Sequence, residues 1–184
     1  MHLLLCGLFL VVTAAAAPAD DFKPEPGFTP LFNGKDLSGW KTKGTKDKTG
    51  ESLEGKAEAF GGRFKVKDGE LVIDPKVKGD VRIETAKEYA KDVTIRLEYL
   101  PGEGCNNDLF FRGQKFDLSK ENVKNIKFGE WNQIEIAVTG DKVEIKSNGE
   151  TARSATTKVE KSTFEIRAEF GPIQIRRLRI KEGG

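Results

Sequence analysis

Apolar residues recur at every second position along most of this sequence, and this period constrains the fold more than any other feature. The runs 93–99, 134–138, 143–145 and 164–170 all show it, with mostly polar residues between the apolar ones. A period of two buries one face of a β-strand and leaves the other face in solvent. The chain is therefore predicted to be rich in half-buried strands.

Turn signals between these runs indicate how the strands connect. Two-residue hairpin signals occur at Asp68-Gly69, Gly140-Asp141 and Asn148-Gly149. Many short antiparallel strands at this spacing predict an all-β sandwich. The parity of the apolar residues changes after Ile175, which predicts a β-bulge or a bend at Arg176-Arg177. Only the segments 84–91 and 118–126 suggest short helices.

The amino-terminal segment has the pattern of a secretory signal peptide. An apolar run from Leu3 to Val12 is followed by small residues up to Ala17, and the run is shorter than the about 20 residues that span a bilayer. We expect a signal peptide over 1–17 and a secreted or periplasmic protein without a membrane span. An uncleaved amino-terminal anchor is the alternative. An extended lead-in over 18–29 would precede one domain over 30–184.

Composition narrows the partners and the chemistry. The sequence has 31 basic and 29 acidic residues and no basic run with interleaved aromatics, so nucleic acid is not an expected partner. Signal cleavage would remove His2, which is the one histidine. A mature chain without histidine excludes Ser-His-Asp triads, Cys-His pairs and histidine zinc sites. Carboxylates, arginines, lysines and amides remain, and calcium is the one cofactor that such oxygen ligands suggest.

Several strings along the chain resemble one protein family. Residues 30–40 read PLFNGKDLSGW, 64–71 read FKVKDGEL, 110–112 read FFR and 129–132 read GEWN. In this order they resemble the 3-keto-disaccharide hydrolase domain family. The resemblance implies a concanavalin A-like jelly roll, a β-sandwich of two antiparallel sheets of which one is concave. It also implies a carbohydrate as the partner.

The chain departs from the family pattern at three places. Asn106-Asn107-Asp108-Leu109 stands where the family has Asn-Ser-Gly-Ile, and Ile166-Arg167 stands where it has Leu-Gln. Only residues 113–128 separate FFR from GEWN, a shorter gap than in larger members. These departures fall on residues that would build the sugar site of larger relatives, so they concern activity more than fold.

Alternation and the resemblance together predict one charged sugar site. If the apolar residues of each strand face the core, their Arg and Glu neighbours face outward, and adjacent strands would join them into one concave surface. The expected catalytic side chains are Glu98, Asp108 and Arg112. The expected substrate-binding side chains are Arg96, Asn106, Asn107, Arg167 and Glu169.

The resemblance implies cleavage of 3-keto-glycosides at this site. A carbonyl at C3 acidifies the C2 hydrogen, so a carboxylate could remove that proton while an arginine stabilises the enolate. Ordinary cross-strand ion pairs on a solvated face are the alternative. The segment 104–108 fits a turn as well as a sugar or calcium site. Trp40 and Trp131 are expected to be core anchors rather than sugar-stacking platforms.

Three functions are consistent with these features. The leading one is a hydrolase or lyase that acts on 3-keto-glycosides. A non-catalytic carbohydrate-binding module would keep the jelly roll without the chemistry. A cell-surface interaction domain would neither bind nor cleave a glycan. No metal ligand is assigned.

Overall fold

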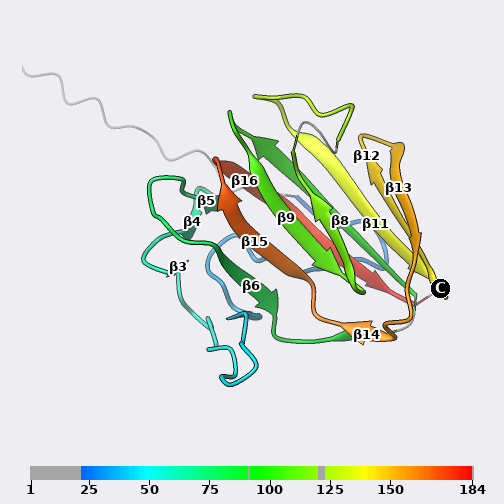
Figure 1. The fold of residues 1–184 in the computed structure, drawn as a ribbon, viewed down its shortest axis with the longest axis horizontal. Coiled ribbons are helices and arrows are strands. Elements are labelled where there is room, and N and C mark those ends of the chain that lie inside the picture. The colour runs from blue at the N-terminus through cyan, green and yellow to red at the C-terminus, as the bar shows by residue number, and fades with distance from the viewer. Residues whose placement is uncertain (1–21, 91, 120–122, 184) are drawn as a thin grey trace, which may run out of the picture.

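The structure is a computed structural model that describes residues 22–90, 92–119 and 123–183. Its strands form two large antiparallel sheets that overlap face to face, and a small third sheet lies at the lower edge of the view (Figure 1). The all-β sandwich of antiparallel sheets expected from the sequence is confirmed. The expected signal peptide over 1–17 lies outside the described residues.

The larger sheet has nine strands. Eight of them lie in the order β13 (Glu150–Thr156), β12 (Lys142–Ser147), β11 (Asn132–Thr139), β8 (Val93–Pro101), β16 (Ile173–Glu182), β5 (Glu70–Ile73), β4 (Phe64–Lys67) and β3 (Glu58–Ala59). The ninth, β1 (Thr29–Pro30), pairs with β16. Strand β16 thus lies at the middle of this sheet, between β8 and β5, and also pairs with β1.

The second large sheet has five strands. They lie in the order β10 (Gln114–Asp117), β9 (Asn106–Phe111), β15 (Glu165–Phe170), β6 (Val81–Thr85) and β2 (Trp40–Thr42). The small sheet pairs β14 (Lys161–Ser162) with β7 (Tyr89–Ala90). Strands that are distant in sequence are neighbours in the five-stranded sheet, so its surface gathers residues from the whole domain.

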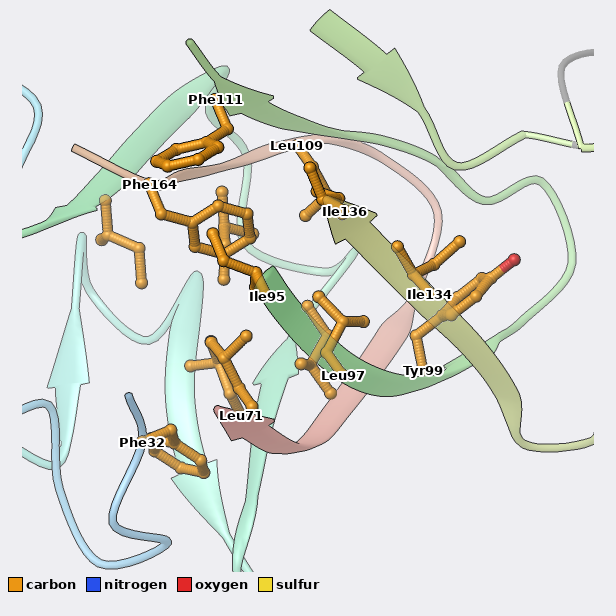
Figure 2. Close-up of a cluster of buried hydrophobic side chains, with 14 of the residues drawn as sticks. Phe32, Leu71, Ile95, Leu97, Tyr99, Leu109, Phe111, Ile134, Ile136 and Phe164 are labelled. Atoms are coloured by element: carbon orange, nitrogen blue, oxygen red, sulfur yellow. The ribbon is translucent and has the colours of Figure 1, made fainter. Parts of the chain in front are cut away.

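The inner faces of the two large sheets supply the hydrophobic core. Alternate side chains of β8, β11, β15 and β16 are buried, as a period of two requires. Figure 2 shows Leu109 and Phe111 of the five-stranded sheet pointing toward Ile95 and Ile136 of the nine-stranded sheet. Because the apolar side chains meet between the sheets, the polar side chains of each sheet face outward on opposite sides of the molecule.

The two tryptophans have different surroundings. Trp40 is 1 % exposed, and its indole N–H donates to the carbonyl of Leu31 at 2.8 Å. The prediction that Trp40 anchors the core is confirmed. Trp131 is only half-buried, and the Arg176 guanidinium lies 3.8 Å from its ring centroid. The same prediction is wrong for Trp131, because this residue lies just before β11 on the outer side of the sheet.

The three predicted hairpin turns are confirmed. Asp68-Gly69, Gly140-Asp141 and Asn148-Gly149 connect β4 to β5, β11 to β12 and β12 to β13. A fourth two-residue turn was not predicted: Arg112 (φ 51°) and Gly113 (φ 73°) connect β9 to β10. Two successive positive φ angles are the backbone of a type I′ turn, which matches the twist of the flanking strands.

The predicted bulge in β16 is also confirmed. The register with β8 shifts between Arg176 and Arg179, and Arg177 has a φ of 50°. Both Arg177 and Leu178 therefore lie opposite the single residue Leu97 of β8. The extra residue explains why the parity of apolar residues changes along this strand.

The helix predicted over 84–91 is wrong for its described residues, 84–90. Glu84 and Thr85 complete β6, and Tyr89 and Ala90 form β7. Thr85 is held in the sheet by its hydroxyl, which accepts from the backbone N–H of Phe164 at 3.0 Å, so tertiary contacts override the local pattern. The second predicted helix, over 118–126, includes residues 120–122, which lie outside the described residues; the described residues on either side of them are not helical. Across the described residues, no helix is long and apolar enough to span a membrane.

Candidate functional site

The outer face of the five-stranded sheet carries charged side chains in two cross-strand rows, which we call the charged face. Residues paired across antiparallel strands lie on the same face of a sheet. The register gives one row of Asp117, Asp108, Arg167 and Arg82, and a second row of Lys115, Phe110, Glu165, Glu84 and Lys41. Leu109 and Ile166, which lie between the rows in sequence, are buried in the core. This alternation fixes both rows on the outside.

Asp108 is the residue of the charged face that is most removed from water. Its exposed fraction is 0 %. One carboxylate oxygen, Oδ2, accepts from the Arg167 guanidinium at 2.9 Å. The other oxygen, Oδ1, accepts no hydrogen bond from the described residues, and the Lys115 ammonium lies 3.6 Å from it. A buried carboxylate with an unused acceptor is uncommon and marks a candidate for function.

The surroundings of Asp108 disfavour its charged form. The pKa of this carboxyl is raised to about 6, chiefly by burial and in addition by the carboxyl of Asp117, while Arg167 and Lys115 oppose the shift. The pKa of Asp117 moves the other way: burial opposes ionisation of Asp117, but its contact with Lys115 lowers the pKa. Two carboxyl groups with pKa values pushed apart are typical of acid–base sites.

Arg167 links the carboxylates at the centre of the charged face. Its guanidinium donates to both oxygens of Asp80 and to Asp108, with Nε 2.7 Å from Asp80 Oδ1, and Nη1 forms an ion pair with Glu169 Oε2 at 2.9 Å. Hydrogen bonds to Asp80 raise its pKa, with further support from Asp108 and Glu169. The side chain is therefore a fixed positive charge beside the buried carboxylate.

The second row is a network of ion pairs around Glu84 and Glu165. The Lys43 ammonium lies 2.7 Å from Glu84 and 2.8 Å from Glu165, and the Thr163 hydroxyl donates to Glu84 at 2.8 Å. Burial opposes ionisation of Glu84, but these contacts outweigh it and lower the pKa. The two carboxylates are held in place by these contacts, and they give the charged face fixed hydrogen-bond acceptors.

An aromatic ring lies among these charges. Phe110 is half-buried in the second row, and the Arg82 guanidinium lies 4.0 Å from its ring centroid. The contact is close enough for a cation–π interaction. A ring surrounded by polar donors and acceptors is typical of carbohydrate sites, because a sugar has both a C–H face and a rim of hydroxyls.

Four predicted site residues meet on the charged face. Asp108 and Arg167 are paired across β9 and β15, and Glu169 lies two residues further along β15. Asn106 begins β9, two residues before Asp108 and on the same side of the strand. Asp108 was predicted as catalytic and the other three as substrate-binding, and the structure brings these four together.

The prediction of one shared surface fails for Arg96 and Glu98. Both lie on the outer face of β8 in the nine-stranded sheet, where Arg96 pairs with Glu135 at 2.7 Å and Glu98 pairs with Arg176 at 2.8 Å. The core separates this face from the charged face. Alternation shows correctly that these residues face outward, but it does not show from which sheet.

The same prediction fails for Arg112. The strand ends at Phe111, so Arg112 occupies the turn before β10 instead of continuing the outer face. The side chain is 2 % exposed, and its guanidinium donates to the carbonyl of Val159 at 2.6 Å. The backbone of Arg112 is held as well: its N–H donates to the Ser162 hydroxyl, and its carbonyl accepts from the Thr157 hydroxyl. These contacts tie the turn to the segment before β14.

Asn107 faces inward rather than toward the charged face. Its amide nitrogen donates to the carbonyl of Phe170 at 3.0 Å, and its amide oxygen accepts from the N–H of Glu169 at 2.9 Å. Both ends of the amide thus hold the backbone at the end of β15. The segment 104–108 is a turn only up to Cys105, since Asn106 already belongs to β9.

The sequence interpretation missed several residues of the charged face, namely Lys41, Lys43, Asp80, Arg82, Glu84, Lys115 and Asp117. Their signal was present, because Lys115 and Asp117 flank the buried Phe116, and Arg82 and Glu84 flank the buried Ile83. What was missing was the strand order, which places β6 and β10 beside β15 and β9. Among the described residues, no group of three or more His, Cys, Asp or Glu could hold a metal ion, and calcium is assigned no ligands.

Comparison with known protein families identifies the part of the chain that matches a described domain. A family model for the 3-keto-alpha-glucoside-1,2-lyase-like domain matches residues 27–125. This range contains Asp108, Lys115 and Asp117, while Arg167 lies beyond it. No curated protein matches the sequence.

Solved structures show the same fold. A predicted glycosyl hydrolase from Parabacteroides distasonis ATCC 8503 has a TM-score of 0.67 at 18 % identity, covering 86 % of this chain and 94 % of that one. The carbohydrate-binding module CBM66 from Bacillus subtilis has a TM-score of 0.52 at 14 % identity, covering 79 % and 96 %. An alginate lyase from Corynebacterium sp. has a TM-score of 0.52 at 12 % identity, covering 86 % and 100 %. The concanavalin A-like jelly roll implied by the resemblance is confirmed, and these likenesses concern the fold alone.

Proposed function

Because this chain belongs to the 3-keto-alpha-glucoside-1,2-lyase-like domain family, we propose that it is an exported glycan-active enzyme that cleaves 3-keto-glycosides on the charged face. One observation carries the proposal. Asp108 is a fully buried carboxylate with one oxygen that accepts no hydrogen bond from the described residues, and it is held beside the fixed charge of Arg167. A base and a cation at one point are what proton removal next to a carbonyl requires.

The proposed reaction is an elimination. The Asp108 carboxylate removes the proton from C2 of the 3-keto sugar, and the electrons of the broken C2–H bond form an enolate with the C3 carbonyl. Arg167 stabilises the enolate oxygen. The enolate then re-forms the C3 carbonyl, a C1–C2 double bond forms, and the C1–O bond breaks as the leaving oxygen takes up a proton from water. Asp108 returns the proton from C2 to the solvent. Addition of water across the double bond would complete a net hydrolysis.

The charge state of Asp108 suits a base near neutral pH. With a pKa raised to about 6, the carboxyl is ionised at pH 7 and is a stronger base than an ordinary aspartate. Lys115 lies over its free oxygen and is nearly half exposed, so this side chain is the element that substrate would displace. Glu169, Asn106 and the ring of Phe110 then border the position of the sugar.

A non-catalytic carbohydrate-binding module is the second candidate. It is favoured by the density of ion pairs on the charged face, where Glu84, Glu165 and Arg167 all have charged partners. It is also favoured by the burial of Asp108, since a base must reach its substrate. In this case the sugar would bind over Phe110 and the rim of the face, without any bond being cleaved.

The experiment that tests the enzyme proposal uses a 3-keto-disaccharide with the purified chain from residue 18 onward. The enzyme should release the two sugar units, and Asp108→Asn should reduce the rate by at least about 100-fold, the scale of a lost general base. Asp68→Asn, on an exposed turn of the other sheet, is the matched control and should keep full activity. Equal rates for Asp108→Asn and the intact chain would overturn the assignment of the base.

Binding without turnover would instead support the second candidate. Calorimetric titration of the same disaccharide into the intact chain separates the two, because a binding module should bind it saturably and leave it uncleaved, whereas the enzyme should release the two sugar units. Arg82→Ala, which removes the cation from the Phe110 ring, should weaken binding in either case.

Export rests on the amino-terminal pattern of the sequence. The apolar run from Leu3 to Val12 and the alanines after it support removal of a signal peptide. Mass spectrometry of the protein recovered outside the cytoplasm should give a chain that begins at residue 17 or 18. A chain that retains its first residues and stays with the cells would contradict export.

A further inference from the structure

We propose that the nine-stranded sheet carries a second saccharide site, specific for a sugar that bears a carboxylate, at the bulge of β16. This site lies on the outer face of β16, beside the turn between β4 and β5 and across the core from the charged face (Figure 1). It is formed by three arginines, Arg176, Arg177 and Arg179, together with the start of the described chain at Phe22.

The bulge is what brings the three arginines together. Strict alternation would turn Arg177 into the core, between Arg176 and Leu178. With the extra residue, Leu178 takes the core position, 1 % exposed, and all three arginines face outward. Arg177 reaches this position with a φ of 50°, a conformation that side-chain-bearing residues seldom adopt. Bulges commonly re-aim side chains next to functional sites.

A cavity of about 490 Å³ lies beside the bulge. This volume is within the range of small-ligand sites. Its apolar wall includes Phe22, Pro24 and Phe32, and its basic wall consists of the three arginines. A second hollow of about 250 Å³ continues past Arg179 to Arg96. An amphipathic cavity with guanidinium groups on one side fits a sugar ring with an acidic substituent.

The guanidinium groups are already fixed in place. Glu98 accepts from Arg176 Nε at 2.8 Å and from Arg177 Nη1 at 2.9 Å. The guanidinium carbon atoms of Arg177 and Arg179 each lie 5.0 Å from the ring centroid of Phe22. A ligand that binds to fixed arginines loses less side-chain entropy in ordering them than one that binds to free arginines.

A carboxylate of the chain itself shows that this group fits here. Glu25 binds Arg179 through two parallel contacts, with Nε 2.6 Å from Oε2 and Nη2 2.7 Å from Oε1. This fork is the geometry that distinguishes a carboxylate from a spherical anion. Glu25 is partly exposed, on the segment that precedes β1. Its contacts with Arg179 model those of a sugar carboxylate, and its negative charge opposes an acidic ligand in the adjacent cavity.

The remaining wall of the cavity suits the neutral part of a sugar. Asp68 and Glu70, at the turn between β4 and β5, also line it, and their carboxylates would accept from sugar hydroxyls. The aromatic ring of Phe22 would cover the C–H face of the same sugar. An inorganic anion would use the guanidinium groups but neither of these features, so the ligand class is a uronic-acid saccharide.

The test uses calorimetry with trigalacturonic acid at physiological ionic strength. The chain from residue 18 onward should bind it, and the methyl-esterified trisaccharide, which has the same rings without the charges, should bind at least about tenfold more weakly. Arg177→Gly should also weaken binding about tenfold or more, since glycine accepts a positive φ without strain and only the guanidinium is lost. Arg153→Ala, on β13, is the control arginine and should leave the affinity unchanged.

Two further arms make the result decisive. Glu25→Gln should strengthen binding of the acidic trisaccharide, because a negative charge beside Arg179 is removed while the shape is kept. Sulfate alone should not displace the trisaccharide at equal charge concentration. Equal affinity for the acid and its methyl ester, or unchanged binding in both Arg177→Gly and Glu25→Gln, would overturn the proposal.

This site and the charged face can be tested separately. Asp108→Asn should abolish cleavage of the 3-keto-disaccharide and leave binding of trigalacturonic acid intact. Arg177→Gly should weaken binding of trigalacturonic acid and leave cleavage of the 3-keto-disaccharide intact. Loss of both properties in Asp108→Asn would mean that the two sheets do not carry separate sites.

Discussion

At the scale of single residues, Asp108 determines the pH dependence that the proposed enzyme should show. A base works only when ionised, so the cleavage rate should rise with pH through a limb near pH 6, the raised pKa of this carboxyl. Asp117→Asn removes a neighbouring carboxyl that raises the Asp108 pKa, so the limb should move to lower pH. Rates measured between pH 4 and 8 check this, and a limb that stays in place would contradict the pairing of the two carboxyls.

Asn107 shows how one inward side chain supports the charged face without taking part in the chemistry. Asn107→Ala removes an amide that bonds the backbone of both Phe170 and Glu169. Leaving these buried groups unpaired should lower the free energy of unfolding by about 1–3 kcal/mol. Chemical denaturation of the variant measures the loss. A variant as stable as the intact chain would show that water replaces the amide.

At the scale of the elements, a residue of a hairpin turn can make long-range hydrogen bonds that the local turn signal does not indicate. Asn148 and Asp68 occupy the same position of similar turns, with φ of 49° and 53°. The Asn148 amide also accepts from the Gln133 N–H and donates to Asn125 and Asn132. Asn148→Gly should therefore cost about 1–3 kcal/mol of unfolding free energy, while Asp68→Gly should stay within about 0.5 kcal/mol.

Denaturation of both glycine variants tests this difference. Equal losses would mean that the backbone conformation, which the two turns share, matters more than the hydrogen bonds that only Asn148 makes. The buried Asn132, which accepts from the Asn148 amide, extends these hydrogen bonds further. Its amide nitrogen donates to the carbonyls of Lys127 and Glu130. The string GEWN thus ends in a structural asparagine.

At the scale of the whole molecule, carboxylates that tie distant segments together should make the fold sensitive to acid. The hydrogen bond to Arg179 lowers the Glu25 pKa from 4.5 to about 2. A lowered pKa means that the folded state favours the ionised form, so this stability is present above pH 4.5 and is lost as the pH falls through 2. Asp108 changes the stability in the opposite direction. Its raised pKa means that the folded state binds a proton at a higher pH than the unfolded state does, so protonation of Asp108 favours the folded state.

Unfolding measured across this pH range tests the linkage. The intact chain should lose stability between pH 4.5 and 2, and Glu25→Gln should show a shallower loss over the same range. Unchanged slopes would mean that the contact between the lead-in and β16 forms only weakly in solution. Because the Glu25 side chain is partly exposed, added salt should also reduce the difference between the two proteins.

The sequence alone was sufficient for the sheet architecture, the hairpins and the bulge. Period-two alternation states which residues of a strand are buried, and turns such as Asp68-Gly69 need only local chemistry. The same signals failed at Arg112, because a positive φ at an arginine has no local signature. They failed as well over 84–91, where pairing with β14 and β15 decided the conformation.

The composition of the candidate site was decided by tertiary structure. Alternation showed that Arg96, Asp108 and Arg167 all face away from the core, but each sheet of a sandwich has an outer face, and facing outward does not say on which of the two a residue lies. Strand order is set by non-local pairing, which brought β9 beside β15 and placed β8 in the other sheet. The burial of Asp108 beneath Lys115 and Arg167 also arises only from that pairing, and with it the environment that could make this carboxyl a base.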